Sequence, residues 1–323
     1  MLLPDGRVVF VPYQSTAIGL FNPTTNMYTT TGTMSPAPGT NAFLGGVLLP
    51  DGRVVFVPST TTVVGIFNPA TNVYSAPVTG LPAGTKYGGG VLLPDGRALF
   101  VPNSALTIGF FNYTNNAYTS VTPSSPALPG SSAYNGGVLL PDGRVVFVPA
   151  GATSIGLFDP TSGTNSGYST ITPTSPALPG NTAYYGGVLL PDGRVVFVPF
   201  NATTIGIFNP AISGPSAYST VAGVTLTNGG GFVGGVLLPD GRVVFIPSNS
   251  TTIGIYNPAL TGAASYTTVA TNLIANAASY YGGILLPDGR VVFIPLTTGA
   301  VGLYLTNTPA PKDFCLHPCF NKF

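Results

Sequence analysis

The residues of this chain that could do chemistry are few and unevenly placed. One histidine, His317, and two cysteines, Cys315 and Cys319, stand together in the sequence CLHPC near the end of the chain. Three soft ligands could begin a zinc site, but a structural zinc site takes four, and the chain has no further Cys or His. A disulfide between Cys315 and Cys319, or two unpaired thiols, is the favoured interpretation. We therefore predict no metal site and no cofactor.

The charged side chains are a second candidate set. The chain has ten basic and nine acidic residues, and seven Arg and seven Asp of these belong to seven copies of Pro-Asp-Gly-Arg. An acid/base pair needs two groups in different environments, whereas a repeat places all seven carboxylates in one environment. We predict structural turns in which each Asp pairs with the Arg of its own or the next unit, each pair contributing about 0–1 kcal/mol. These residues are Asp5, Arg7, Asp51, Arg53, Asp95, Arg97, Asp142, Arg144, Asp192, Arg194, Asp240, Arg242, Asp288 and Arg290.

Composition argues against several classes of function. The net charge is +1 without a basic run, so nothing neutralises the phosphates of a nucleic acid. Pro and Gly interrupt every apolar run well before the ~18 residues of a membrane span, so we predict no membrane insertion, and no signal peptide is visible. No nucleophile has a base near it in the repeats. The sequence therefore predicts that the chain is not an enzyme.

The repeat itself determines the predicted fold. The seven Asp of the Pro-Asp-Gly turns are 44 to 50 residues apart, a period typical of repeat architectures. Each unit reads as four short strands whose apolarity falls from the first to the last, as in a propeller blade. We predict an all-β fold, a seven-bladed β-propeller of four-stranded antiparallel blades, and favour it over a β-solenoid. Residues 1–306 would form one domain. Either the tail 307–323 supplies part of the last blade, or the natural protein carries further sequence.

The unit also resembles the repeats of the kelch and galactose-oxidase-like β-propeller superfamily. The matching stretches are Leu93-Pro94-Asp95-Gly96 and Phe67-Asn68-Pro69-Ala70-Thr71-Asn72-Val73-Tyr74. Two features depart from that pattern: Val198-Pro199 replaces a glycine pair, and a Tyr replaces the closing Trp. The resemblance implies a propeller from about Leu2 to Thr306. The copper oxidases of this superfamily use His, Tyr and Cys around the metal, and the only His here lies outside the repeats.

An aromatic residue stands two positions before each Gly-Gly pair and is the remaining candidate site. At the start of an innermost strand, six such rings could surround a channel mouth and bind a ligand; the alternative is that they wedge between blades as core. They are Phe43, Tyr87, Tyr134, Tyr184, Phe232 and Tyr280.

The predicted function is a non-catalytic structural or protein-interaction module. The alternative is a carbohydrate-binding, lectin-like propeller that uses the aromatic ring. Few charges repel one copy from another, so we expect a protein partner or self-association, with a glycan as a further candidate ligand. The predicted location is extracellular or on a particle surface.

Overall fold

Each unit begins with a hairpin whose turn follows from the sequence Leu-Pro-Asp-Gly-Arg. In the first unit, the Leu3 amide donates to the Arg7 carbonyl at 2.8 Å and the Gly6 amide donates to the Leu3 carbonyl at 3.0 Å. Gly6 has φ 83, a region that favours glycine, and Pro4 presets the preceding φ. The same two backbone hydrogen bonds recur in all seven sequence repeats. Local chemistry thus fixes the register of every first hairpin.

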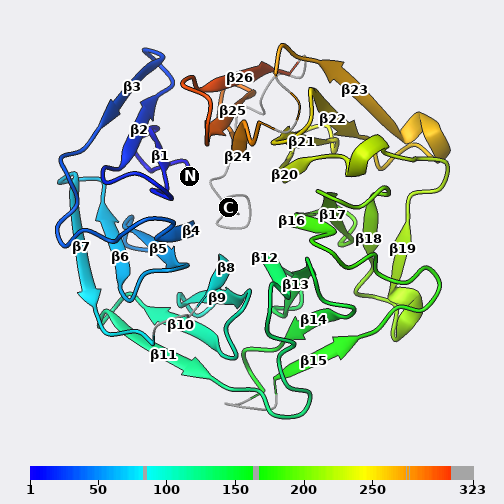
Figure 1. Cartoon of the computed structure of the whole chain (residues 1–323), viewed down its shortest axis with the longest axis horizontal. Coiled ribbons are helices and arrows are strands. Elements are labelled where there is room, and N and C mark those ends of the chain that lie inside the picture. Colours follow the sequence, from blue (N-terminus) through cyan, green and yellow to red (C-terminus); the bar gives the residue numbers. More distant parts are fainter. Residues whose placement is uncertain (83–85, 163–166, 274, 276, 307–323) are drawn as a thin grey trace. The chain divides into compact units, whose positions relative to one another are not determined.

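The computed structural model describes residues 1–306 except 83–85, 163–166, 274 and 276. Its strands form seven antiparallel blades arranged as a β-propeller (Figure 1), which confirms the predicted fold class. The described residues contain no α-helix and three short 3-10 helices: η1 (Pro215–Ala217), η2 (Thr227–Gly229) and η3 (Gly262–Ser265). They divide into two compact units, one with Met1–Phe147 and Leu157–Ser169, the other with Val148–Gly156 and the described part of Thr170–Leu316.

Blades 1 to 3 lie in the first unit. Their strands are β1 (Val8–Phe10), β2 (Gly19–Asn22), β3 (Met27–Thr30), β4 (Phe43–Leu48), β5 (Val54–Pro58), β6 (Val64–Asn68), β7 (Val73–Val78), β8 (Tyr87–Leu92), β9 (Ala98–Pro102), β10 (Ile108–Asn112) and β11 (Ala117–Val121). Blade 4 has residues in both units. Its strands are β12 (Tyr134–Leu139), β13 (Val145–Pro149), β14 (Ile155–Phe158) and β15 (Tyr168–Ile171).

Blades 5 to 7 lie in the second unit. Their strands are β16 (Tyr184–Leu189), β17 (Val195–Pro199), β18 (Gly206–Phe208), β19 (Tyr218–Thr220), β20 (Phe232–Leu237), β21 (Val243–Pro247), β22 (Thr252–Tyr256), β23 (Tyr266–Ala270), β24 (Tyr280–Leu285), β25 (Arg290–Pro295) and β26 (Gly302–Leu305). Blades 2 to 6 have four strands each, in sequence order across the sheet. Within the described residues, blades 1 and 7 have three.

The two glycines of each Gly-Gly pair have different roles. In blade 3, Gly89 has φ 131, and the register of β8 against β9 shifts between Tyr87 and Gly90, as in a β-bulge. A Cβ on Gly90 would lie 2.6 Å from Val47 Cγ2 and 2.8 Å from Val57 Cγ2, both in blade 2. The first glycine therefore permits the bulge, and the second permits close packing between blades.

Burial decreases outward within each blade. All five residues of β5 are buried, whereas β7, the fourth strand of the same sheet, alternates between exposed and half-buried residues. A continuous apolar run in the second strand fits a strand covered on both faces. The core is therefore a series of layers between adjacent sheets, built mainly from second strands.

Candidate functional site

The six aromatic residues that precede the Gly-Gly pairs belong to the core, which corrects the prediction of a ligand-binding ring. Their side chains are between 0% and 8% exposed, and they are Phe43, Tyr87, Tyr134, Tyr184, Phe232 and Tyr280. The Tyr87 ring of blade 3, for example, packs in one cluster with Val47 and Val57 of blade 2, so it lies between neighbouring sheets. A ligand cannot reach them in the folded chain. The alternative interpretation, that they wedge between blades, describes their position.

Five of these rings pack over a glycine in the third strand of their own blade: Phe43, Tyr87, Tyr184, Phe232 and Tyr280. In blade 3, a Cβ on Gly109 would lie 2.9 Å from the Tyr87 ring. Tyr87 packs against Phe100 with ring centroids 5.6 Å apart, and Phe100 stacks on Tyr118 at 6.4 Å. The Tyr87 and Tyr118 hydroxyls are 2.6 Å apart, and Thr107 Oγ1 lies 3.0 Å from the Tyr87 hydroxyl. We call this arrangement of three rings over one glycine the aromatic stack.

The tyrosines of the aromatic stacks are poor proton carriers at neutral pH. Burial raises the pKa of Tyr87, Tyr168, Tyr184 and Tyr218 above the ordinary value of 10.0. A neutral phenol that is buried and already hydrogen-bonded has no reason to ionise there. These hydroxyls therefore stabilise the blades.

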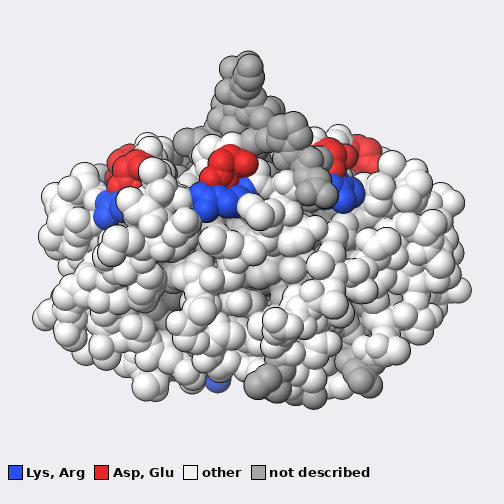
Figure 2. All heavy atoms as spheres, turned by 90° about the horizontal axis from the view of Figure 1, so that it is seen from above, with Lys and Arg blue, Asp and Glu red and all other residues white. Residues whose placement is uncertain are grey.

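The Asp and Arg side chains of the turns form seven ion pairs. In each of the seven repeats, the Asp carboxylate lies 2.6–2.7 Å from the Arg guanidinium of the same turn. Figure 2 shows red and blue side chains next to one another on a surface that is otherwise almost uncharged. The hydrogen bond from Arg194 lowers the pKa of the Asp192 carboxyl below its ordinary value, against partial desolvation. A carboxylate held ionised in this way suits a turn better than acid/base catalysis.

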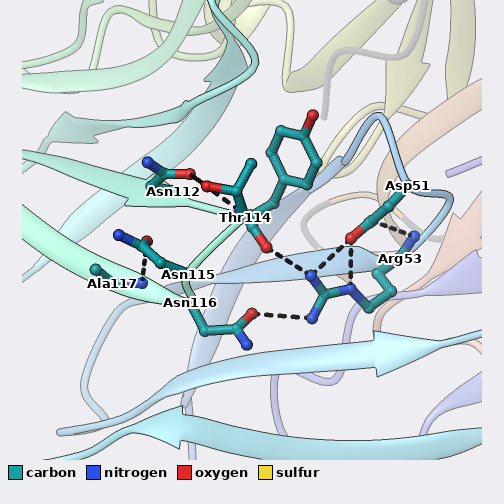
Figure 3. A network of polar contacts seen from close by, with 8 residues as sticks. Asp51, Arg53, Asn112, Thr114, Asn115, Asn116 and Ala117 are labelled. Carbon is teal, nitrogen blue, oxygen red and sulfur yellow. Dashed lines mark hydrogen bonds and ion pairs between the residues drawn. The ribbon is translucent and has the colours of Figure 1, made fainter.

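Two of these arginines, one in blade 1 and one in blade 2, also reach the next blade. There they donate to amide and carbonyl oxygens instead of to a second Asp. Arg53 donates to Asn116 Oδ1 at 2.9 Å and to the Tyr113 carbonyl at 2.8 Å (Figure 3). Arg7 makes the equivalent contacts to Asn72 and Pro69. Neighbouring blades are therefore joined by hydrogen bonds between turns.

The third candidate set, Cys315, His317 and Cys319, lies outside the described residues. Among the residues that the structure describes, no three His, Cys, Asp or Glu side chains are grouped as a metal site would require. The predicted disulfide therefore stays a prediction.

The sequence analysis missed a tyrosine pair in the second unit. Tyr185 in β16 and Tyr281 in β24 are partly buried, and their hydroxyl oxygens are 2.5 Å apart. The two rings meet edge to face with centroids 5.6 Å apart, and Phe200, just after β17, lies 5.4 Å from the Tyr185 ring. Two hydroxyls from strands of different blades thus meet among aromatic rings, an arrangement that can bind and polarise a polar group.

A signal for this pair was present in the repeat. The residue between the core aromatic and the Gly-Gly pair varies from blade to blade, although its neighbours hardly vary, and only blades 5 and 7 have a tyrosine there. The six residues are Leu44, Gly88, Asn135, Tyr185, Val233 and Tyr281. Because side chains alternate, this position faces the opposite side of the innermost strand from the core. A variable position inside a constant repeat indicates a role other than packing.

Comparison with known proteins gives the fold. No protein-family model matches the chain, and no curated protein matches it. A streptogramin B lyase structure is similar, with 16% sequence identity, a TM-score of 0.71, and coverage of 93% of this chain and 90% of that one. A fungal alcohol oxidase of the AA5 family, in complex with copper, is 14% identical with a TM-score of 0.64 and coverage of 90% and 68%.

A third similar structure is the extracellular domain of a hybrid two-component system from B. thetaiotaomicron. It is 11% identical with a TM-score of 0.67, and the match covers 96% of this chain and 39% of that one. These comparisons support the seven-bladed propeller. Membership of the kelch family stays a prediction.

The comparisons correct the predicted function. A lyase and an alcohol oxidase share this fold over at least 90% of the chain, so the prediction of a non-catalytic structural or interaction module, with no enzyme activity, was wrong. The lectin-like alternative also loses its site, since its aromatic ring is buried. We found no helix among the described residues with the length and apolarity needed to cross a membrane.

Proposed function

We propose that this propeller is an enzyme that acts on a small, uncharged substrate at Tyr185 and Tyr281. The observation that carries the proposal is the contact of their hydroxyls at 2.5 Å, on innermost strands of two blades. The innermost strand of the blade between them, β20, contacts both β16 and β24. The pair therefore lies on one continuous surface of the second unit.

The hydroxyl pair can move a proton or stabilise a negative charge. One phenol donates to the other, and a phenol oxygen can both donate and accept a hydrogen bond. Hydrogen bonds in such a chain polarise one another. A tyrosine can act as general acid or base, and a phenol aimed at a developing oxyanion lowers the barrier of carbonyl chemistry. The reaction class that fits is elimination or isomerisation next to a carbonyl.

The surroundings of the pair favour an uncharged substrate. Phe200 supplies an aromatic wall, and Val233, the equivalent residue of β20, is 5% exposed. In the described part of the second unit, the charged side chains are the three turn pairs at Asp192, Asp240 and Asp288. These turns follow the ends of the innermost strands, whereas the tyrosines stand at the beginnings. An ionic substrate would find no counter-charge here, and desolvating its charge would be costly.

Binding of a neutral aromatic ketone tests the site. We would titrate the full chain with 4-fluoroacetophenone and follow the ligand by fluorine NMR. The expected result is binding that weakens at least tenfold, about 1.4 kcal/mol, in the double variant Y185F/Y281F. Tyr113→Phe, which removes a half-buried hydroxyl in the first unit, is the matched control and should bind like the native chain.

Turnover tests the catalytic part of the proposal. Incubation with a panel of β-hydroxy ketones and lactones, followed by mass spectrometry, should give at least one product that Y185F/Y281F forms about 100-fold more slowly. Equal binding and equal turnover by the native chain and the double variant would overturn the proposal.

We infer an extracellular location, in line with the extracellular domain among the similar structures. The scarcity of Lys also supports it, since few sites are then open to proteases that cut after lysine. Fractionation of the source cells, with detection of the chain in the medium or on the surface, tests this, and recovery only from the cytoplasm would contradict it.

A further inference from the structure

The outer edge of blade 7 differs from that of every other blade. Its third strand, β26, is the last strand of its sheet within the described residues. Leu303 and Leu305 of this strand are 43% and 71% exposed, whereas Ile207 and Ile255, which occupy the position of Leu303 in blades 5 and 6, are 4% and 6% exposed. An open strand edge with exposed apolar side chains is a site for a further strand.

The aromatic stack of blade 7 is incomplete at the same place. Tyr280 packs against Phe293 with centroids 5.4 Å apart, and a Cβ on Gly302 would lie 2.8 Å from the Tyr280 ring. Two rings and the glycine are thus in place. The third ring, which the fourth strand supplies in blade 5 as Tyr218, has no counterpart among the described residues of blade 7.

The spacing of the chain identifies a candidate for that ring. In blades 4, 5 and 6, the last aromatic residue of the third strand is followed ten residues later by the tyrosine that begins the fourth strand. These pairs are Phe158 and Tyr168, Phe208 and Tyr218, and Tyr256 and Tyr266. Ten residues after Tyr304, the last aromatic of β26, stands Phe314.

The residues before Phe314 follow the same pattern. In blade 5, Pro215 opens η1 three residues before Tyr218, and Pro311 stands three residues before Phe314. One position departs: blades 5 and 6 have Gly214 and Gly262 at positive φ, where this segment has Ala310. An alanine adopts that conformation less readily, so the match between this segment and blades 5 and 6 is not complete.

We propose that residues 314–316, which lie outside the described residues, pair with β26 as the fourth strand of blade 7. In blade 5, Phe208 pairs with Tyr218 and Gly206 with Thr220. The same register pairs Tyr304 with Phe314 and Gly302 with Leu316. The Phe314 ring then completes the aromatic stack, and the strand covers the edge that exposes Leu303 and Leu305. The occupant is thus a segment of the same chain, and this inference is independent of the proposed function.

Amide hydrogen exchange on the full native chain tests the proposal directly. The amides of residues 314–316 should exchange at least 100-fold more slowly than those of a free peptide of the same sequence. This protection should not change when the protein is diluted a hundredfold. Protection that disappears on dilution would assign the edge to a second copy and overturn the proposal, as would the absence of protection.

Substitution provides a second test with a matched control. Phe314→Ser should lower the Tm by several degrees and raise the exchange rates of β26 amides. Phe320→Ser, the same change six residues later in the tail, should leave both unchanged. Equal effects of the two substitutions would overturn the assignment of Phe314 to the stack, and the exchange measurement on the native chain remains decisive if Phe314→Ser does not fold.

Discussion

Blades 2 and 3 build the same aromatic stack with different chemistry. In blade 3, the Tyr87 and Tyr118 hydroxyls bind each other at 2.6 Å, and Thr107 supports them. In blade 2, Phe43 stands in place of Tyr87, and the buried Tyr74 hydroxyl has no hydrogen-bond partner within the described residues. The rings nevertheless pack alike, with Phe56 and Tyr74 centroids 6.4 Å apart, as for Phe100 and Tyr118.

This difference separates packing from hydrogen bonding. The geometry of the stack is set by three rings over a glycine, and it forms whether or not the hydroxyls are paired. A buried polar group without a partner costs more than a typical hydrogen bond gains. Blade 2 therefore carries a penalty that blade 3 avoids, although both have the same fold.

The largest expected effect comes from the glycine that both blades share. Gly65→Ala and Gly109→Ala would place a Cβ 2.7–2.9 Å from the rings of Phe43 and Tyr87. Overpacking of this kind costs about 1–3 kcal/mol, so the free energy of unfolding in urea should fall by that amount in both variants. Gly32→Ala, where a Cβ would meet nothing within 4 Å, is the control. If only one of the two blades were affected, the stacks would not be equivalent.

A smaller effect, of opposite sign in the two blades, should follow removal of the fourth-strand hydroxyl. Tyr118→Phe breaks the hydroxyl pair of blade 3 and should lower the free energy of unfolding by about 1 kcal/mol. Tyr74→Phe removes the unpaired buried hydroxyl of blade 2 and should raise it by a similar amount. Thermal and urea unfolding measure both. Destabilisation by both substitutions would show that Tyr74 has a hydrogen-bond partner in solution, such as a bound water.

The sequence determines the fold more directly than the site. The period of the Pro-Asp-Gly turns, and the chemistry by which Gly6 and its equivalents fix each hairpin, act locally and can be read from residues alone. The functional surface depends on which side of a strand a residue faces, and a shift of one position reverses that side. The predicted ring at Tyr184 is core for this reason, whereas its neighbour Tyr185 meets Tyr281 from a strand 96 residues away.

The smallest expected effect is on the pH dependence of the Tm, through the unpaired Tyr74 hydroxyl of blade 2. Burial raises the pKa of Tyr74 to about 12, whereas a tyrosine in the unfolded chain has a pKa of about 10. Between these values the unfolded state releases the proton and the folded state keeps it. The stabilisation is therefore complete below pH 10 and is lost as the pH rises toward 12. Because the side chain is only partly buried, the effect on Tm is about 1–2 °C.

Native protein and Tyr74→Phe should thus differ in how far the Tm falls between pH 9 and pH 11, with the smaller decrease in the variant. Blade 3 differs from blade 2 in this respect. Tyr87 also has a raised pKa, but its hydroxyl is held by Thr107 as well as Tyr118. If the Tm of Tyr74→Phe and of the native protein fell by the same amount between pH 9 and pH 11, the Tyr74 hydroxyl would have to be hydrated in the folded state. Blade 2 would then carry no penalty for an unpaired buried hydroxyl.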